Sequence, residues 1–185
     1  RSGHARAAGR DPRPHHARVS AGIRIRHAEP ADAAGLHALF SERPAYAGTL
    51  QPPYPSLDAW TRRLSGMPAH VVQLVADDAG TVVGAAGFEV LQHPRRRHVA
   101  NLGMAVSETR RGEGIGRALL AAALDTAERW HGVRRIELEV YLDNAAAIAL
   151  YTAHGFEREG IARSYALRDG VYVDVALMAR LAADA

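Results

Sequence analysis

The 185-residue sequence contains no cysteine. Disulfide bonds, thiolate nucleophiles and zinc sites with cysteine ligands are therefore excluded. Lysine is also absent, because all 23 residues of the Lys and Arg class are arginine, and this excludes the lysine-containing Walker A loop. No apolar run approaches the roughly 20 residues that cross a bilayer, and no charged-then-apolar signal segment opens the chain. We expect a cytoplasmic protein, with no membrane partner, whose chemistry uses oxygen and nitrogen groups.

The positive charge of the chain is concentrated at its beginning. The formal net charge is +3 and the calculated pI is about 9.7. Residues 1–20 hold five arginines and one aspartate, a net charge of +4, so the rest of the chain carries −1. A folded part without a net positive charge lacks the basic surface that attracts DNA or RNA. We expect no nucleic-acid partner.

One domain accounts for the length and composition of the chain. A sequence of 185 residues with 48% hydrophobic and 23% charged residues is typical of a globular protein with a substantial core. Residues 1–21 contain Gly, Pro and His without periodicity, so we expect a tail that is flexible or foreign to the natural protein. The folded domain is expected at residues 22–182.

Hydrophobic periodicity predicts a mixture of strands and helices. Alternation with a period of two predicts strands at residues 23–27, 71–76, 81–91, 98–106, 136–141, 156–167 and 171–181. Apolar residues at helical spacing predict helices at residues 31–40, 57–64, 114–130 and 145–153. The proline- and glycine-containing segment 44–55 is expected to be a loop that could form a pocket wall.

Turn signals and element order predict the strand directions. Asp77–Gly80 and Asp169–Gly170 are hairpin turn sequences, so the strands on either side of each should be antiparallel. The order strand, helix, strand across residues 98–141 predicts a parallel pair. The intervening helix should bury one stripe of residues, namely Ile115, Leu119, Ala122, Ala123, Thr126 and Trp130.

Three glycines, at positions 112, 114 and 116, separate the predicted strand 98–106 from that helix. Glycine lets the backbone approach a ligand closely, and the N–H groups at a helix start can surround a phosphate, with Arg111 as a charged donor. The third glycine is misplaced for the G-x-G-x-x-G pattern of dinucleotide-binding folds. The spacing favours another kind of phosphate loop, and the alternative is a glycine-rich turn that binds nothing.

A second pattern lies downstream, where Asn144, Tyr151, Gly155 and Phe156 form N-x6-Y-x3-G-F. Together with the upstream R-x-x-G-x-G loop it resembles the acyl-CoA-binding motifs of GNAT acetyltransferases, and the resemblance extends over residues 23–181. It implies an α+β GNAT fold: a mixed, mostly antiparallel sheet of about seven strands, helices on both faces, and a central V-shaped cleft for acetyl-CoA as co-substrate.

The resemblance also implies which residues contact acetyl-CoA. The end of the strand 98–106 should pair with the pantetheine arm, and the loop should bind the diphosphate. The implied residues are Met104, Ala105, Val106, Arg111, Gly112, Glu113, Gly114, Ile115, Gly116, Arg117, Asn144 and Tyr151. Asn144 could equally serve as the N-cap of its helix.

Tyr151 is the candidate general acid for the departing thiolate, because an unperturbed tyrosine pKa of about 10 leaves the phenol protonated at neutral pH. The alternative is that Tyr151 only packs on its helix. Glu139 is the candidate general base by resemblance to ribosomal-protein alanine acetyltransferases, in which a glutamate stands at the same distance before the tyrosine. A solvated strand glutamate is the alternative, and Glu89 and His98 are further candidates.

Shorter segments resemble broad-specificity L-amino acid N-acetyltransferases. They are Thr49–Gln51, His98–Ala100 and Tyr165–Gly170. Phosphinothricin-type acetyltransferases are similar as well. The candidate residues for acceptor binding are Tyr46, Thr49, Gln51, His98 and Tyr165, and the alternative for the tyrosines, Thr49 and Gln51 is a role in the core or at an interface. The arginines at 95–97 are interpreted as a solvated turn.

We therefore expect an N-acetyltransferase that uses acetyl-CoA and acetylates the primary amine of a small molecule, such as an L-amino acid or an analogue. Direct attack in a ternary complex is expected, since no cysteine can carry the acetyl group. The alternatives are acetylation of a protein N-terminus or lysine, and a catalytically silent acyl-CoA-binding module. No metal is expected, because the histidines lack ligand spacing, and a homodimer is compatible with the family.

Overall fold

The computed structural model describes residues 22–182, so the predicted tail at residues 1–21 lies outside the described residues. The described chain forms one seven-stranded sheet in the order β1-β2-β3-β4-β5-β7-β6. The strands are β1 (Ile23–His27), β2 (Val71–Asp78), β3 (Thr81–Val90), β4 (Val99–Val106), β5 (Arg135–Tyr141), β6 (Glu157–Arg168) and β7 (Val171–Leu181). β4 and β5 are parallel, and the other neighbouring pairs are antiparallel. The predicted mixed, mostly antiparallel sheet is confirmed.

Both predicted hairpins form with the expected turn chemistry. Ala79 and Gly80 have φ angles of 48° and 92°, and Asp169 and Gly170 have φ angles of 52° and 78°. Two successive positive φ angles match the right-handed twist of the flanking strands. The backbone N–H of Gly80 also donates to Asp77 Oδ1 at 2.7 Å, which fixes the first turn.

Helices cover both faces of the sheet. Three of them, α1 (Ala33–Ser41), α2 (Arg43–Ala47) and α3 (Leu57–Ser65), pack on one face, while α4 (Ile115–Trp130) and α5 (Ala145–Ala153) pack on the other. Three short 3-10 helices lie at Pro30–Asp32, Pro94–Arg96 and Glu108–Arg110. The predicted N-cap of α3 is confirmed, because Ser56 Oγ accepts a hydrogen bond from the Ala59 N–H at 3.3 Å.

The segment predicted as a loop at residues 44–55 begins with a helix. Pro44 occupies the first turn of α2, where its missing N–H breaks no hydrogen bond. A proline at that position therefore starts a helix as readily as it interrupts one. The rest of the segment is non-helical up to α3.

The predicted stripe of α4 is correct at its centre and wrong at its end. Ile115, Leu119 and Ala123 are buried as predicted, whereas Trp130 is 77% exposed. The chain turns at Gly132, with a φ angle of 66°, and the N–H of Val133 donates to Ala127 O at 3.0 Å. The fully buried Val133 thus fills the core beyond the last turn, and Trp130 is left in solvent.

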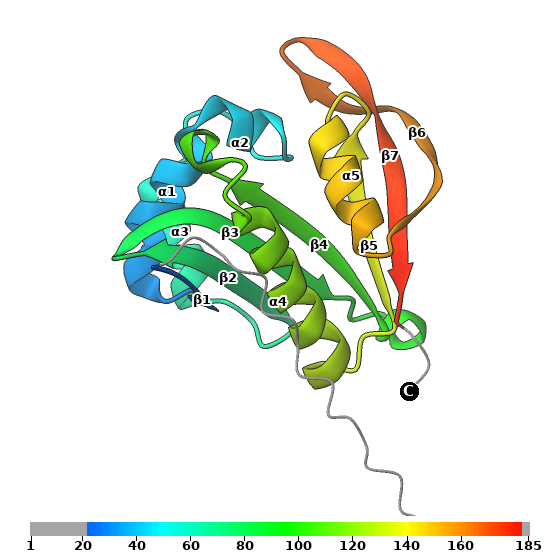
Figure 1. Ribbon diagram of the computed structural model, residues 1–185, viewed down its shortest axis with the longest axis horizontal. Helices are drawn as coiled ribbons and strands as arrows, with labels where there is room; N and C mark the ends of the chain where they lie inside the picture. Colours follow the sequence, from blue (N-terminus) through cyan, green and yellow to red (C-terminus); the bar gives the residue numbers. More distant parts are fainter. Residues whose placement is uncertain (1–21, 183–185) are drawn as a thin grey trace, which may run out of the picture.

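β4 and β5 pair only where they begin. The register joins Val99, Ala100 and Asn101 to Arg135, Ile136 and Glu137. Beyond these three pairs the two strands diverge, and Figure 1 shows the V-shaped opening between them. In contrast, β4 stays paired with β3 from Ala100, opposite Val90, to Val106, opposite Gly84. This divergence agrees with the V-shaped cleft that the resemblance implies.

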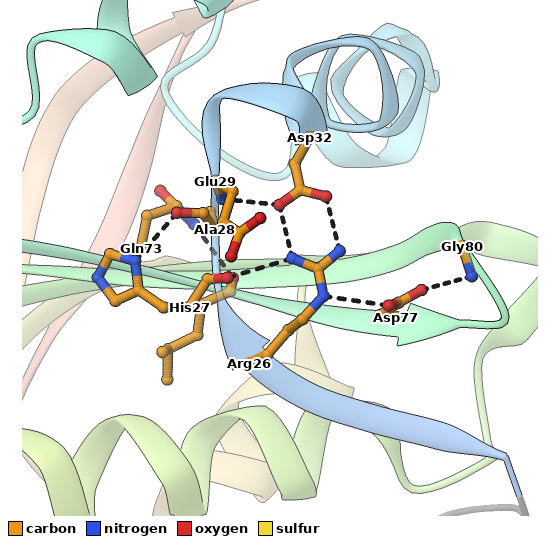
Figure 2. A network of polar contacts seen from close by, with 9 residues as sticks. Arg26, His27, Ala28, Glu29, Asp32, Gln73, Asp77 and Gly80 are labelled. Carbon is orange, nitrogen blue, oxygen red and sulfur yellow. Dashed lines mark hydrogen bonds and ion pairs between the residues drawn. The ribbon is translucent and has the colours of Figure 1, made fainter.

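A network around Arg26 fixes β1 against the start of the helical layer (Figure 2). The guanidinium donates two hydrogen bonds of 2.7 Å to Asp32 and one of 3.0 Å to Asp77. Asp32 also accepts the Glu29 N–H at 2.7 Å. Nearby, the Ala28 N–H donates to the backbone oxygen of Gln73 at 2.8 Å. These contacts determine where α1 leaves the sheet.

Candidate functional site

A cleft of about 740 Å³ passes through the opening between β4 and β5. On one side of the sheet it is lined by the start of α4 and by α5, and on the other side by α1, α3 and the segment after α2. The cleft therefore connects the two faces of the sheet at the point where the strands separate.

The loop before α4 has the geometry of an anion-binding site. Gly112 and Gly114 have φ angles of 83° and 82°, and Gly114 is the N-cap of α4. The helical hydrogen bonds begin with the Ala118 N–H donating to Gly114 O at 3.0 Å. The N–H groups of residues 115–117 precede that bond and have no carbonyl partner within the helix. These N–H groups and the helix dipole favour a negatively charged ligand.

The arginines of the loop divide into paired and unpaired side chains. Arg110 donates to Asp78 at 2.7 Å and to Glu113 at 2.8 and 2.9 Å. Arg111 and Arg117 line the cleft, are not buried, and form no ion pair within residues 22–182. The charge available to a ligand is therefore that of Arg111 and Arg117.

Eleven of the twelve residues predicted to contact acetyl-CoA line this cleft. Glu113 is the exception, because its carboxylate is engaged by Arg110. A Cβ at Gly116 would make ordinary van der Waals contacts with Leu150 at 3.4 Å and Met104 at 3.5 Å. Asn144 lines the cleft and also caps α5, with its Oδ1 accepting the Ala147 N–H at 3.2 Å.

Tyr151 projects from α5 into the core beneath the cleft and is 6% exposed. Its ring lies 5.6 Å from that of Phe156. Burial raises the pKa of Tyr151 to about 12. The hydroxyl has no hydrogen-bond partner in the described part of the chain, yet it is not among the fully enclosed atoms. The hydroxyl therefore opens onto the cleft, protonated and available to donate.

Glu139 and Tyr165 lie together on the other side of the opening. Both line the cleft. Burial, and then the charge of the Glu139 carboxylate, raise the pKa of the Tyr165 phenol. Glu139 itself is exposed, so a ligand can reach its carboxylate.

The segment after α2 is tied to β5 at the cleft. Tyr141 Oη donates to Thr49 O at 3.3 Å, and the Arg168 guanidinium lies 4.5 Å from the centre of the Tyr141 ring. Thr49 and Gln51, both predicted to bind the acceptor, line the cleft here.

Two residues predicted for acceptor binding lie away from the cleft. His98 is exposed at the start of β4, and its carbonyl accepts the N–H groups of Arg134 and Arg135 at 2.8 and 3.1 Å. That position is about 25 Å along the strand from Val106. Tyr46 is on α2, whose cleft-lining residues are Pro44 and Ala45. Neither residue is among those that line the cleft.

Comparison with known proteins places this geometry in a family. A family model described as the Acetyltransferase (GNAT) family matches residues 36–156. The L-amino acid N-acetyltransferase AaaT of Escherichia coli K12 is 43% identical over 159 residues, which cover 86% of this chain and 98% of the relative. The chain belongs to the GNAT acetyltransferase family.

Solved GNAT structures have the same fold. An acetyltransferase of the GNAT family from Streptococcus pneumoniae is 29% identical with a TM-score of 0.76, over 86% of this chain and 99% of that one. A phosphinothricin acetyltransferase from Sinorhizobium meliloti, solved in complex with AcCoA, is 26% identical with a TM-score of 0.77, over 86% and 88%. The predicted family, the GNAT fold and the enzyme class, an N-acetyltransferase of the EC 2.3.1 type, are confirmed.

The residues that line the cleft on the side of α1 and α3 were mostly not predicted from the sequence. On the side of α1 and α3 the cleft is lined by Phe40, Trp60, Arg63, Gln73, Gly87 and Gly103, among others. The rings of Phe40 and Trp60 stack at 5.0 Å, and Arg63 lies over Trp60 at 5.1 Å. A signal for this half was present, because glycines inside predicted strands often mark the close approach of a ligand.

Neither a metal site nor a membrane span is found in the described residues. Residues 22–182 contain no group of three or more His, Asp or Glu side chains that could hold a metal ion. None of the helices in that range is long and apolar enough to cross a membrane.

Proposed function

We propose that this enzyme transfers the acetyl group of acetyl-CoA to the primary amine of a small molecule, an L-amino acid or an analogue. One observation carries the proposal: the anion-binding loop, Tyr151 and Glu139 line the same cleft as Trp60 and Arg63 of α3. The 43% identity to an L-amino acid N-acetyltransferase over nearly its whole length supports the choice of acceptor.

The residues of the cleft fit acetyl-CoA. The N–H groups of residues 115–117, with Arg111 and Arg117, would hold its phosphates. The edge of β4 from Met104 to Val106 has no strand partner on the side of the opening, so its backbone groups can pair with the pantetheine amides. Acetyl-CoA supplies an acetyl group as a thioester, which an amine can attack directly.

The side chains around the opening supply the proton transfers. Tyr151, with a pKa of about 12, stays protonated at neutral pH and can donate to the departing thiolate. Glu139 can accept a proton from the acceptor ammonium, directly or through water. Glu89 lines the same cleft and is the second carboxylate for that role. Direct attack in a ternary complex is the consequence, since the chain has no thiol to carry the acetyl group.

The charges of the acceptor side favour a zwitterion. Arg63 lines the cleft over Trp60 and forms no ion pair within the described residues. A free guanidinium is suited to a carboxylate. Glu139 and Glu89 in the same cleft suit an ammonium. An amino acid carries both groups, whereas a polyamine offers nothing to Arg63.

The test is thiol release from acetyl-CoA in the presence of a panel of L-amino acids, their decarboxylated analogues and short peptides. The chain has no cysteine, so thiol reagents report released CoA without background from the protein. We expect turnover with free amino acids and little with peptides. Turnover restricted to peptides would instead support a protein acetyltransferase, and acetyl-CoA binding without turnover would support the silent module. A homodimer and a cytoplasmic location remain predictions.

A further inference from the structure

A row of residues across three strands forms part of the cleft wall beneath α3. Gln73 on β2 pairs with Gly87 on β3, and Gly87 pairs with Gly103 on β4. Residues directly opposite one another in adjacent strands project from the same face. All three line the cleft, so this row offers one long side chain followed by two positions without any.

The Gln73 carboxamide holds a fixed orientation, since the residue is only 6% exposed. Its Nε2 donates to the carbonyl oxygens of Ala86 and Leu74 at 3.2 and 3.4 Å. The opposite orientation would place Oε1 against two acceptors, so the amide is assigned by this network. Oε1 therefore lies over Gly87, where it is 2.9 Å from the position of a Cβ.

The Gln73 Oε1 atom lacks a donor. Within residues 22–182 it accepts no hydrogen bond, but it is not among the enclosed, unsatisfied atoms, so it is in contact with the cleft. Because Oε1 is open to the cleft, its lone pairs can accept a hydrogen bond from an N–H group of a ligand bound there.

The space beside this oxygen is open. A Cβ at Gly103 would meet no atom within 4 Å. Across the opening, Gly103 and Glu139 each lie two residues beyond the last paired residues, Asn101 and Glu137. Because strand side chains alternate with a period of two, both positions belong to the same face. The hollow over Gly103 is thus bounded by the Gln73 carboxamide on one side and faces Glu139 on the other.

We propose that the hollow over Gly103 is the subsite for the amine of the acceptor, with Gln73 Oε1 accepting a hydrogen bond from the acceptor nitrogen. The inference rests on the proposed N-acetyltransferase function. Gln73 orients the nitrogen through one N–H, while Glu139 faces another proton that must leave before attack. Gly103 keeps the space free, which accounts for a glycine in the interior of a strand.

Two variants test the subsite, one by removing the hydrogen-bond acceptor and the other by filling the hollow. Gln73→Met keeps the length of the side chain and removes the acceptor oxygen. Gly103→Ala adds a methyl group to the hollow, and its matched control is Gly160→Ala on β6, where a Cβ also meets nothing within 4 Å. Gly160 does not line the cleft. Each variant is assayed by steady-state kinetics for the acceptor, by acetyl-CoA binding and by thermal unfolding.

We expect Gln73→Met and Gly103→Ala to lower kcat/KM for the acceptor by about 10- to 100-fold, the range for a hydrogen bond to a charged group. The acetyl-CoA affinity should stay within about 2-fold of that of the wild type, and Gly160→Ala should match the wild type in kcat/KM as well. A purely structural role would instead lower the unfolding midpoint and affect both substrates alike, and that result contradicts the subsite. Wild-type kcat/KM in both variants contradicts it too.

The outcome separates the two proposals. The acceptor in these assays is whichever amine of the panel the wild type acetylates. If that amine is a peptide, the proposed amino-acid specificity fails while the amine subsite is still tested with the peptide. If no amine is acetylated, both proposals fail.

Discussion

Tyr141 on β5 donates a hydrogen bond to the carbonyl oxygen of Thr49 in the segment after α2. This contact connects two parts of the chain 92 residues apart, and both residues line the cleft. The Tyr141 phenol therefore helps to position the segment that covers the acceptor side of the cleft.

Removing that phenol should weaken acceptor binding. We expect Tyr141→Phe to raise the KM for the acceptor about 3- to 10-fold, because a neutral hydrogen bond contributes on the order of 1 kcal/mol. The acetyl-CoA affinity should not change, since no hydrogen bond joins Thr49 to the loop before α4 within the described residues. Tyr172→Phe, on the exposed part of β7, is the matched control. An equal effect of both substitutions would contradict the role of the contact.

The proposed proton donor has its own kinetic signature. Tyr151→Phe should reduce kcat by about 10²- to 10⁴-fold, the usual contribution of general acid catalysis, with unchanged acetyl-CoA affinity. The raised pKa, about 12, keeps the phenol protonated through the accessible pH range, so loss of the Tyr151 proton should produce no alkaline fall in rate well below pH 12. Steady-state pH profiles provide the measurement, and Tyr54→Phe, at a 96% exposed tyrosine, is the control. Undiminished turnover of Tyr151→Phe would remove the role.

The anion-binding loop should determine coenzyme affinity. We expect Arg111→Ala to raise the Kd of acetyl-CoA by about 10-fold or more, as for the loss of a hydrogen bond to a charged group. The difference should shrink at high ionic strength, because salt screens an exposed charge. Arg95→Ala, in the exposed turn before β4, should leave the Kd unchanged. Calorimetric titration of both variants decides whether the loop binds the coenzyme.

Arg63 should distinguish acceptors that carry a carboxylate. Arg63→Ala is expected to raise the KM for an L-amino acid about 10-fold and to leave the KM for the corresponding decarboxylated amine unchanged. The neighbouring Arg62 is paired with Asp58 and makes a matched control as Arg62→Ala. If Arg63→Ala affects both acceptors equally, the guanidinium does not bind the carboxylate.

The Arg26 network predicts a pH-dependent stability. The hydrogen bonds from Arg26 lower the pKa of Asp32 below its ordinary value, so the carboxylate contributes stability above about pH 4, and this contribution is lost as the pH falls through the folded-state pKa. Asp32→Asn should lower the free energy of unfolding by about 1–3 kcal/mol at pH 7. The difference from the wild type should diminish at more acidic pH. Urea unfolding measures both, with the exposed Asp58→Asn as control, expected to change stability by less than about 1 kcal/mol.

Local patterns were sufficient to predict most of the fold. Period-two alternation, the Ala79–Gly80 and Asp169–Gly170 turns and the glycines before α4 each act over a few residues, so the strands and hairpins could be predicted without tertiary contacts. α2 could not be distinguished from a loop, because Pro44 is compatible with both. Trp130 was misplaced because the exposure of a helix end depends on the path of the chain beyond it, here through Gly132 and Val133.

The coenzyme side of the cleft could be predicted from local sequence patterns, and the acceptor side could not. The coenzyme side is built from residues close in sequence, and its loop and α5 form recognisable motifs. The acceptor side combines Gln73, Gly87 and Gly103, which the strand register brings together, with Arg63 of α3, which lines the same cleft. His98 was predicted for that side from segment resemblance, and such a resemblance does not reveal the direction of a side chain.

The three residue pairs that join β4 to β5 leave the sheet with a narrow bridge between its first four and last three strands. A molecule bound in the opening would contact both the first four and the last three strands and would add contacts between them. Occupancy of the opening should therefore raise the melting temperature in proportion to the logarithm of ligand concentration.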